Sequence, residues 1–188
     1  MKTTVAVLHY QRHLLPTGKL TLELLPGYQM ETFIFALKHG LSLGLHMDDL
    51  PCHLGSIGTV VTVEDFYSAD RNSILSIQVL GEERYLVNRS RVTPTGIHLA
   101  DVTMLPSWPE QLLDDDAQLL SEKLQSMFER YPELGCLHHY PNFDSLTWLC
   151  QRWLELLPLP ISEKQYLMSS NSCTDTAQYL LSLMKELH

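Results

Sequence analysis

The chain has 188 residues, of which 45% are hydrophobic and 19% charged, an ordinary composition for a protein with one buried core or two small ones. Its formal net charge of -9 is uneven: residues 1–105 hold 8 Lys and Arg against 10 Asp and Glu, and residues 106–188 hold 5 against 12. An acidic chain is unsuited to phosphate-rich partners, so we expect no DNA, no membrane surface, and RNA only as an unfavoured alternative. Without a membrane-length apolar stretch or a signal peptide, the sequence predicts a cytoplasmic protein.

The first half of the sequence alternates between apolar and polar residues, which is typical of strands with one buried face. The predicted strands cover residues 5–7, 20–24, 41–47, 57–64, 75–79, 83–89 and 97–104. An apolar stripe at helical spacing predicts one short helix, which ends at Gly40. That stripe consists of Met30, Phe33, Ile34 and Leu37. The pattern predicts a small, partly closed antiparallel β-barrel with one short helix.

From Pro106 the apolar period changes to 3.6, which predicts helices. The first is expected to begin near Pro109 and to stop before Pro132, and a second covers residues 146–157. Ser162, followed three residues later by Gln165, has the spacing of a capping box and predicts the start of a third. We therefore expect a β-rich subdomain at 1–105 and a helical subdomain at 106–188.

Four local motifs resemble the substrate-binding N-terminal domain of Lon-type ATP-dependent proteases. The motifs are GSIGTVVTVEDF at 55–66, LSIQVLGEERY at 75–85, ADV at 100–102, and WLCQRWLELLPL at 148–159 with Lys164 and Gln165. The resemblance implies an α+β fold, in which a PUA-like β-barrel precedes a C-terminal helical bundle. The chain departs from the family at 20–28, where LTLELLPGY lacks the Glu and Arg that flank the family's proline. Tyr28 is still expected to pack at the start of the helix.

No phosphate-binding loop is present, because Gly18-Lys19 is followed by Leu20 and lacks the upstream glycine. We expect neither the ATPase nor the Ser-Lys protease activity of Lon in this chain, and no GxSxG element favours another hydrolase. A peptidase label would follow from family membership alone. The chain is therefore expected to be non-catalytic and to need no cofactor.

Two clusters were considered as metal sites: Cys136 with His138 and His139, and His46 with Cys52 and His53. Neither has paired ligands at a repeated spacing, so a packed loop is the favoured interpretation and no metal is expected. The four cysteines form no CxxC pair and are expected to be free thiols. Asp114, Asp115 and Asp116 are interpreted as the solvated first turn of a helix.

Aromatic residues at strand ends are the candidate binding residues, because a rigid scaffold often displays its contacts there. They are Tyr10, Phe66, Tyr67 and Trp108, with Arg71 nearby. The alternative is that Phe66 and Trp108 only plug the end of the barrel and the joint between subdomains.

The favoured function is binding of a peptide, an unfolded protein or a protein partner, at an open barrel edge or in a groove between barrel and helices. A small-ligand or RNA-binding PUA-like module, and an uncharacterised enzyme with a pocket at the joint, remain as alternatives.

Overall fold

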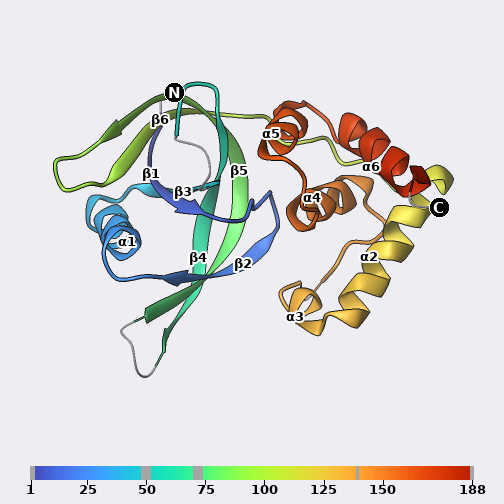
Figure 1. The fold of residues 1–188 in the computed structure, drawn as a ribbon, viewed down its shortest axis with the longest axis horizontal. Coiled ribbons are helices and arrows are strands. Elements are labelled where there is room, and N and C mark those ends of the chain that lie inside the picture. The colour runs from blue at the N-terminus through green and yellow to red at the C-terminus, as the bar shows by residue number, and fades with distance from the viewer. Residues whose placement is uncertain (1–2, 48–51, 70–73, 139, 187–188) are drawn as a thin grey trace. The chain divides into compact units, whose positions relative to one another are not determined.

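The protein is described here by a computed structural model, which covers all residues except 1–2, 48–51, 70–73, 139 and 187–188 (Figure 1). The chain divides into two compact units, Met1–Pro106 and Ser107–His188. The first holds all six strands and one helix found among the described residues, and the second holds the remaining helices. The mixed α+β class is confirmed, whereas the predicted subdomains, 1–105 and 106–188, stay a prediction.

The β-rich unit consists of one curled, six-stranded sheet in the order β2-β5-β4-β3-β1-β6, with a further pairing between β5 and β6. Its elements are β1 (Thr3–Tyr10), β2 (Lys19–Leu24), α1 (Tyr28–His39), β3 (Ser42–Met47), β4 (Ile57–Ala69), β5 (Ile74–Val92) and β6 (His98–Met104). The first half of β5 pairs with β2 and its second half with β6, so this strand returns the sheet upon itself. The result is not a clean barrel.

Two expectations about the strands are wrong. The sheet is not wholly antiparallel, because β1 and β3 pair in parallel. A parallel pair needs a crossover between its strands, and the chain supplies β2 and α1 between them. The strands predicted at 75–79 and 83–89 are a single strand, β5, which continues through Gly81. β5 can continue through position 81 because this residue is glycine. A Cβ at this position would collide with the backbone of Leu15.

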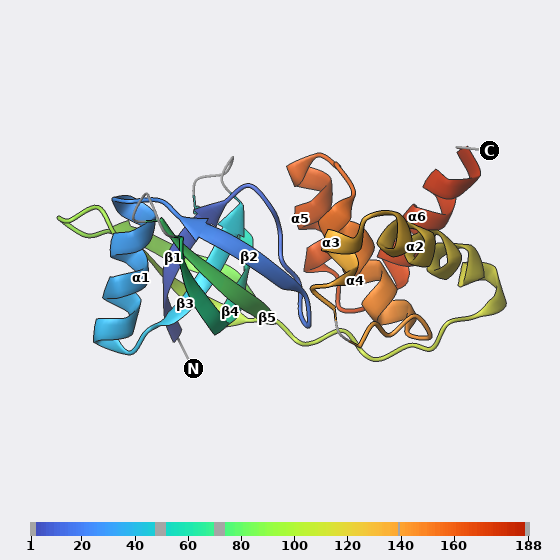
Figure 2. The ribbon, with the colours of Figure 1, turned by 90° about the horizontal axis from the view of Figure 1, so that it is seen from below.

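Helix α1 packs against β1 and β3 (Figures 1 and 2). Its first residue, Tyr28, donates a hydrogen bond of 2.7 Å from Oη to the carbonyl oxygen of Val7. The predicted apolar stripe is partly wrong, because Phe33 and Ala36 are buried while Ile34 and Leu37 are exposed. The segment is apolar enough to offer two stripes, and packing on the sheet selects the one that contains the small Ala36. Gly40 ends the helix in the left-handed conformation, as predicted, with φ of 61°.

The sheet buries side chains on both faces, in two clusters. The larger cluster contains Leu22, Ile77 and Val79 beside α1. The smaller is centred on Tyr85, whose ring lies against Gly44 and Gly58. Leu43 and Leu45 of β3 belong to the larger cluster, while Gly44 lies against Tyr85 and His46 contacts Ser56. Residues 43–46 are therefore all buried, and the alternation predicted for this strand is lost.

The helical unit contains η1 (Asp115–Ala117), α2 (Gln118–Arg130), α3 (Pro132–Gly135), α4 (Leu146–Leu156), α5 (Ile161–Ser169) and α6 (Thr174–Glu186). The first helix begins later than expected, because the chain near Gln111 is extended and its backbone hydrogen-bonds to the segment at the start of α4. Asp114 caps η1 by accepting from the N–H of Ala117, as its placement in a first turn predicts. Ser162 forms no cap, because α5 begins one residue earlier, after Pro160. A closed helical bundle stays a prediction.

Helix α4 carries the most specific sequence motif and is buried from Leu146 to Leu154, on all sides. Ser145 caps it by accepting from the N–H of Trp148. The Arg152 guanidinium forms two contacts of 2.9 Å with Glu155 and lies over the Trp148 ring. The motif residues are therefore explained by packing and by a buried ion pair. Among the described residues, no helix is long and apolar enough to cross a lipid bilayer.

Candidate functional site

The hairpin of β4 and β5 leaves part of one strand with a partner on one side only. Residues Thr59–Val61 of β4 pair with β3, but from Thr62 onward the described pairings join β4 only to β5. Along this stretch β5 is paired on its other side with β2, so β4 is the outer strand of the sheet there (Figure 1). The outer edge of β4 over residues 62–67 is thus able to receive a further strand. One of its N–H groups, that of Phe66, already donates to the Asp65 carboxylate at 2.8 Å.

Two adjacent aromatic residues stand on this edge. Phe66 is 68% exposed and Tyr67 is 49% exposed. They pair with Ile77 and Ser76 of β5, so their side chains lie on opposite faces of the hairpin. Tyr67 is held loosely by a hydrogen bond of 3.4 Å from its Oη to Gln78 Oε1. A strand added here would meet an aromatic side chain on each face.

An irregularity in pairing sets this arrangement. Val63 pairs with Val79 and Asp65 with Gln78, so Glu64 is an extra residue in β4, a β-bulge. The bulge inverts the alternation beyond it and places Phe66 on the face that Ile77 shares. Glu64 lies 2.7 Å from Lys19 Nζ on β2. A hydrogen bond with the Asp65 carboxylate raises the pKa of Tyr67, so the phenol keeps its proton.

The other predicted contact residues are placed differently. Tyr10 is half-buried and packs against the larger hydrophobic cluster. Trp108 is buried, and its Nε1 donates to the carbonyl oxygen of Ser170 at 2.7 Å. Arg71 lies outside the described residues. Of the four candidate residues that the structure describes, only Phe66 and Tyr67 are exposed side by side, and their role in binding stays a prediction.

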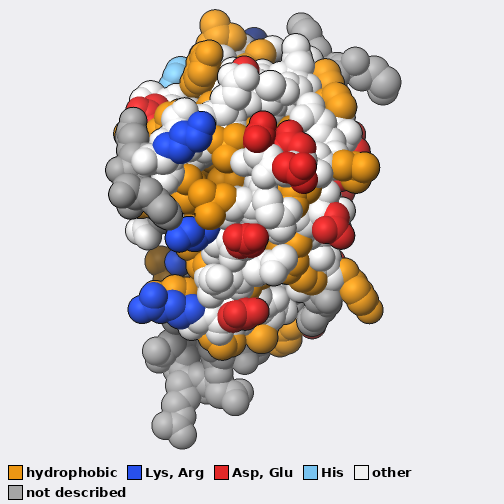
Figure 3. Space-filling view, turned by 90° about the vertical axis from the view of Figure 1, so that its right-hand side faces the viewer, with side chains coloured by type: hydrophobic (Ala, Val, Ile, Leu, Met, Phe, Trp, Pro, Cys, Tyr) orange, Lys and Arg blue, Asp and Glu red, His pale blue; other side chains and the backbone are white. Residues whose placement is uncertain are grey.

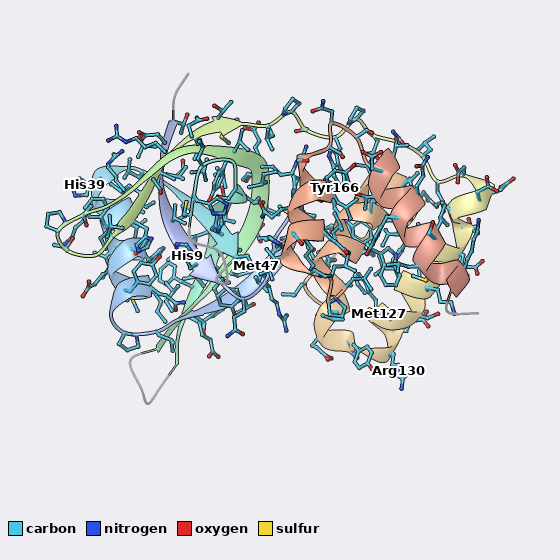
Figure 4. All side chains as sticks on the ribbon, turned by 45° about the horizontal axis from the view of Figure 1, so that its top comes forward. His9, His39, Met47, Met127, Arg130 and Tyr166 are labelled. Atoms are coloured by element: carbon cyan, nitrogen blue, oxygen red, sulfur yellow. The ribbon has the colours of Figure 1, made fainter. Side chains whose placement is uncertain are left out.

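A cluster of histidines at the ends of three strands was not found from the sequence. His9 of β1 (labelled in Figure 4) lies between His98 of β6 and His46 of β3, at ring centroid distances of 5.0 and 5.6 Å. His9 Nε2 and His98 Nδ1 are 3.3 Å apart. Burial lowers the pKa of His46, which favours its neutral form. In the part of the chain that the structure describes, no three His, Cys, Asp or Glu converge as metal ligands would; His139 lies outside that part.

His46 also contacts a serine, at 3.0 Å between Nε2 and Ser56 Oγ. The same hydroxyl donates to the carbonyl oxygen of His53 at 2.7 Å, so its single proton is shared between two acceptors. His46 Nδ1 faces the backbone oxygen of Met47 at 3.2 Å, where a catalytic triad would have a carboxylate. With both residues buried, the pair is better explained as a clamp on the loop that precedes β4.

All four cysteines are free, as predicted; Cys52, Cys150 and Cys173 are buried, and Cys136 is exposed. A hydrogen bond with Cys150 lowers the pKa of Cys173 to about 7. Burial raises the pKa of Cys52 to about 11. The thiols therefore differ widely in the ease with which they ionise.

A groove of about 450 Å³ lies between α5 and α6, entirely within the helical unit. It is lined by Glu163, Tyr166, Leu167, Asp175, Gln178, Tyr179 and Ser182. Tyr179 Oη donates to Glu163 at 2.5 Å, which ties the two helices together. Sequence reasoning missed this groove, although each helix carries an acid followed by a tyrosine at helical spacing, Glu163 with Tyr166 and Asp175 with Tyr179.

Among the solved structures that are similar to this chain, two Lon N-terminal domains align along nearly its whole length. The Lon N-terminal domain protein from Xanthomonas campestris aligns with a TM-score of 0.74 and 23% identity, over 96% of this chain and 98% of that chain. The N-terminal domain of the Lon protease from Mycobacterium avium complex aligns with a TM-score of 0.67 and 17% identity, over 96% and 97%. No protein-family model matches the sequence, and no curated protein matches it. The resemblance to Lon N-terminal domains is therefore confirmed at the level of the fold.

Proposed function

We propose that this protein is a non-catalytic binding module that takes up an extended segment of a peptide or unfolded protein along the outer edge of β4. The observation that carries the proposal is the coincidence of a half-paired strand, residues 62–67, with the exposed pair Phe66 and Tyr67. Either feature alone is common on protein surfaces. Together they supply backbone hydrogen bonds for affinity and side-chain contacts on both faces.

The edge also has features that limit unwanted pairing. Glu64 and Asp65 place two carboxylates beside the aromatics, and the bulge at Glu64 interrupts a flat edge. Charges and bulges of this kind discourage self-association of exposed strands. They also favour a segment whose apolar residues are accompanied by Lys or Arg. Weak binding, in the micromolar range, fits a short edge with two aromatic contacts.

The likeness to Lon N-terminal domains supports the same conclusion, because the resemblance implies substrate binding rather than catalysis. Among the described residues, the Ser56–His46 contact is buried and lacks an orienting carboxylate, which argues against a hydrolase. The formal charge of -9 argues against RNA. A protein or peptide partner is the function that these observations favour together.

The test is a titration with a fluorescein-labelled octapeptide of alternating valine and threonine flanked by lysines, followed by fluorescence anisotropy. We expect Phe66→Ser and Tyr67→Ser each to weaken binding about tenfold, as for an aromatic contact at an interface. Leu37→Ser is the matched control, because Leu37 is an exposed apolar residue of the same unit that lies on a helix. It should leave the affinity unchanged.

A second experiment tests the added strand itself. Two versions of the octapeptide carry N-methyl groups on alternate amides, one version on the odd and the other on the even positions. In a β-strand, alternate N–H groups point to the same side, so only one version should lose affinity. The proposed site would be refuted if both methylated peptides bound as tightly as the parent peptide. It would also be refuted if the parent peptide bound the Phe66→Ser and Leu37→Ser variants with equal affinity.

A further inference from the structure

We propose that the groove between α5 and α6 is a second binding site, which takes an arginine side chain of a partner peptide. The groove is formed only by residues of the helical unit, so this inference does not depend on the hairpin site. Three features carry it: two carboxylates without a cationic partner among the described residues, two tyrosine rings, and an apolar floor.

The carboxylates come first. Glu163 accepts from the hydroxyl of Tyr179, and Asp175 accepts from the hydroxyl of Ser170 at 2.7 Å. The ion pairs found among the described residues involve neither of them. Each lies in the first turn of its helix, where the helix dipole stabilises the ionised carboxylate without neutralising it. Two carboxylates therefore line the groove without a cationic partner among the described residues.

The surroundings reinforce this charge. Residues 106–188 hold 5 Lys and Arg against 12 Asp and Glu. On the side of the molecule where α2 and α6 lie in Figure 1, acidic side chains are spread over the middle of the face and basic ones lie along one border (Figure 3). Lys164, the neighbour of Glu163, is not among the residues that line the groove. Its side chain is buried, and the nearby charge that acts on it is that of Glu155. The lining of the groove itself contains two carboxylates and neither Lys nor Arg, which favours a cation there.

The rings distinguish arginine from other cations. Tyr166 is 68% exposed on α5 (Figure 4), and Tyr179 lines the groove from α6. A planar guanidinium stacks on an aromatic ring and at the same time donates paired hydrogen bonds to a carboxylate. A compact ammonium does not combine these contacts. The buried side chain of Leu167 forms the floor, against which the methylenes of arginine would pack.

The test is an NMR titration of the ¹⁵N-labelled full chain with the peptide Gly-Ser-Arg-Ser-Gly, capped at both ends. Saturable shifts are expected for amides of α5 and α6. Glu163→Gln, Asp175→Asn and Tyr166→Ala should each weaken binding about threefold to fivefold, as exposed ion pairs and cation–π contacts do. Glu122→Gln is the matched control, because it removes one exposed acid of the same unit outside the groove, and its affinity should equal that of the wild type.

Two comparison peptides complete the experiment. A citrulline peptide, which keeps the shape of arginine without its charge, should not bind. Equal affinity of a lysine peptide would overturn the assignment to arginine. Equal weakening by Glu122→Gln and Glu163→Gln would show attraction to the acidic unit as a whole and would overturn the site, as would the absence of saturable shifts.

Discussion

The hydroxyl of Tyr85 offers a sharp test of how the smaller core cluster packs. Tyr85 has no exposed surface, and its Oη has no hydrogen-bond partner among the described residues. Burial also raises the pKa of this phenol well above its ordinary value, so the group stays neutral. An unsatisfied buried hydroxyl costs about 1 to 3 kcal/mol. We therefore expect Tyr85→Phe to raise the free energy of unfolding of the β-rich unit by about 1 kcal/mol.

The two glycines that flank the ring give the opposite prediction. A Cβ at Gly44 would lie 2.6 Å from Tyr85 Oη and 2.9 Å from Cε1. At Gly58 it would overlap the end of the same ring and lie 2.8 Å from the backbone oxygen of Leu45. Overpacking of a rigid core costs about 1 to 3 kcal/mol. Gly58→Ala should lie at the upper end, because a backbone atom cannot move aside, and Gly44→Ala at the lower end.

Equilibrium unfolding in urea measures all of these variants. All three tryptophans lie in Ser107–His188, so their fluorescence reports the helical unit, whereas the NMR signals of backbone amides in the six strands report the β-rich unit. Combining Gly44→Ala with Tyr85→Phe should recover part of the loss, because the Oη contact is removed and the Cε1 contact remains. A Tyr85→Phe variant less stable than wild type by 1 kcal/mol or more would refute the unsatisfied hydroxyl. A Gly58→Ala variant of unchanged stability would refute the close packing.

Four further outcomes are expected. Ser145→Ala removes the N-cap of α4 and should lower the free energy of unfolding of the helical unit by about 1 kcal/mol, measured in urea by tryptophan fluorescence. Glu155→Gln leaves the Arg152 guanidinium buried without its counter-charge and should cost about 3 kcal/mol in the same assay, whereas a loss below 1 kcal/mol would contradict the buried pair. Burial lowers the pKa of His46 from 6.5, so the contribution of the neutral imidazole to the free energy of unfolding is fully present above that pH. The free energy of unfolding should fall as the pH drops below 6.5. His46→Gln should weaken this dependence in urea titrations from about pH 8 to about pH 5. In native protein a chromogenic disulfide reagent should modify Cys136 first, with the three other thiols reacting only on denaturation; rapid reaction of a second thiol would contradict their burial.

Part of the proposed binding site could be predicted from the sequence. The alternation at residues 57–64 and 75–79 predicts two strands, and both are found, paired antiparallel as parts of β4 and β5. Phe66 and Tyr67 are among the candidate binding residues of the sequence, and both are exposed, whereas their role in binding stays a prediction. Trp108 differs because its ring is buried and its N–H is bonded to Ser170, a residue 62 positions away. No local pattern in the sequence distinguishes an aromatic residue that stays exposed from one that is buried against a distant segment of the chain.

The groove shows the same limit. Glu163 with Tyr166, and Asp175 with Tyr179, are visible in the sequence as two acid–tyrosine pairs at helical spacing. Their convergence depends on how α5 and α6 pack side by side, which neither helix encodes alone. A prediction from spacing finds the faces of helices but not which faces meet.

The sequence by itself determined what depends on neighbours along the chain. Leu20, Leu22 and Leu24 are buried in β2 while Thr21 and Glu23 are exposed, because a strand alternates its side chains. Gly40 ends α1 because it adopts a positive φ without a steric penalty.

Only the tertiary structure decided what depends on distant partners. The parallel pairing of β1 with β3, the buried face of α1 and the bulge at Glu64 each follow from which surfaces meet. The burial of α4 on every side follows likewise from packing within the folded chain. Hydrophobic burial has no direction of its own, so a local apolar pattern permits several packings, and complementary packing across the whole fold selects one of them.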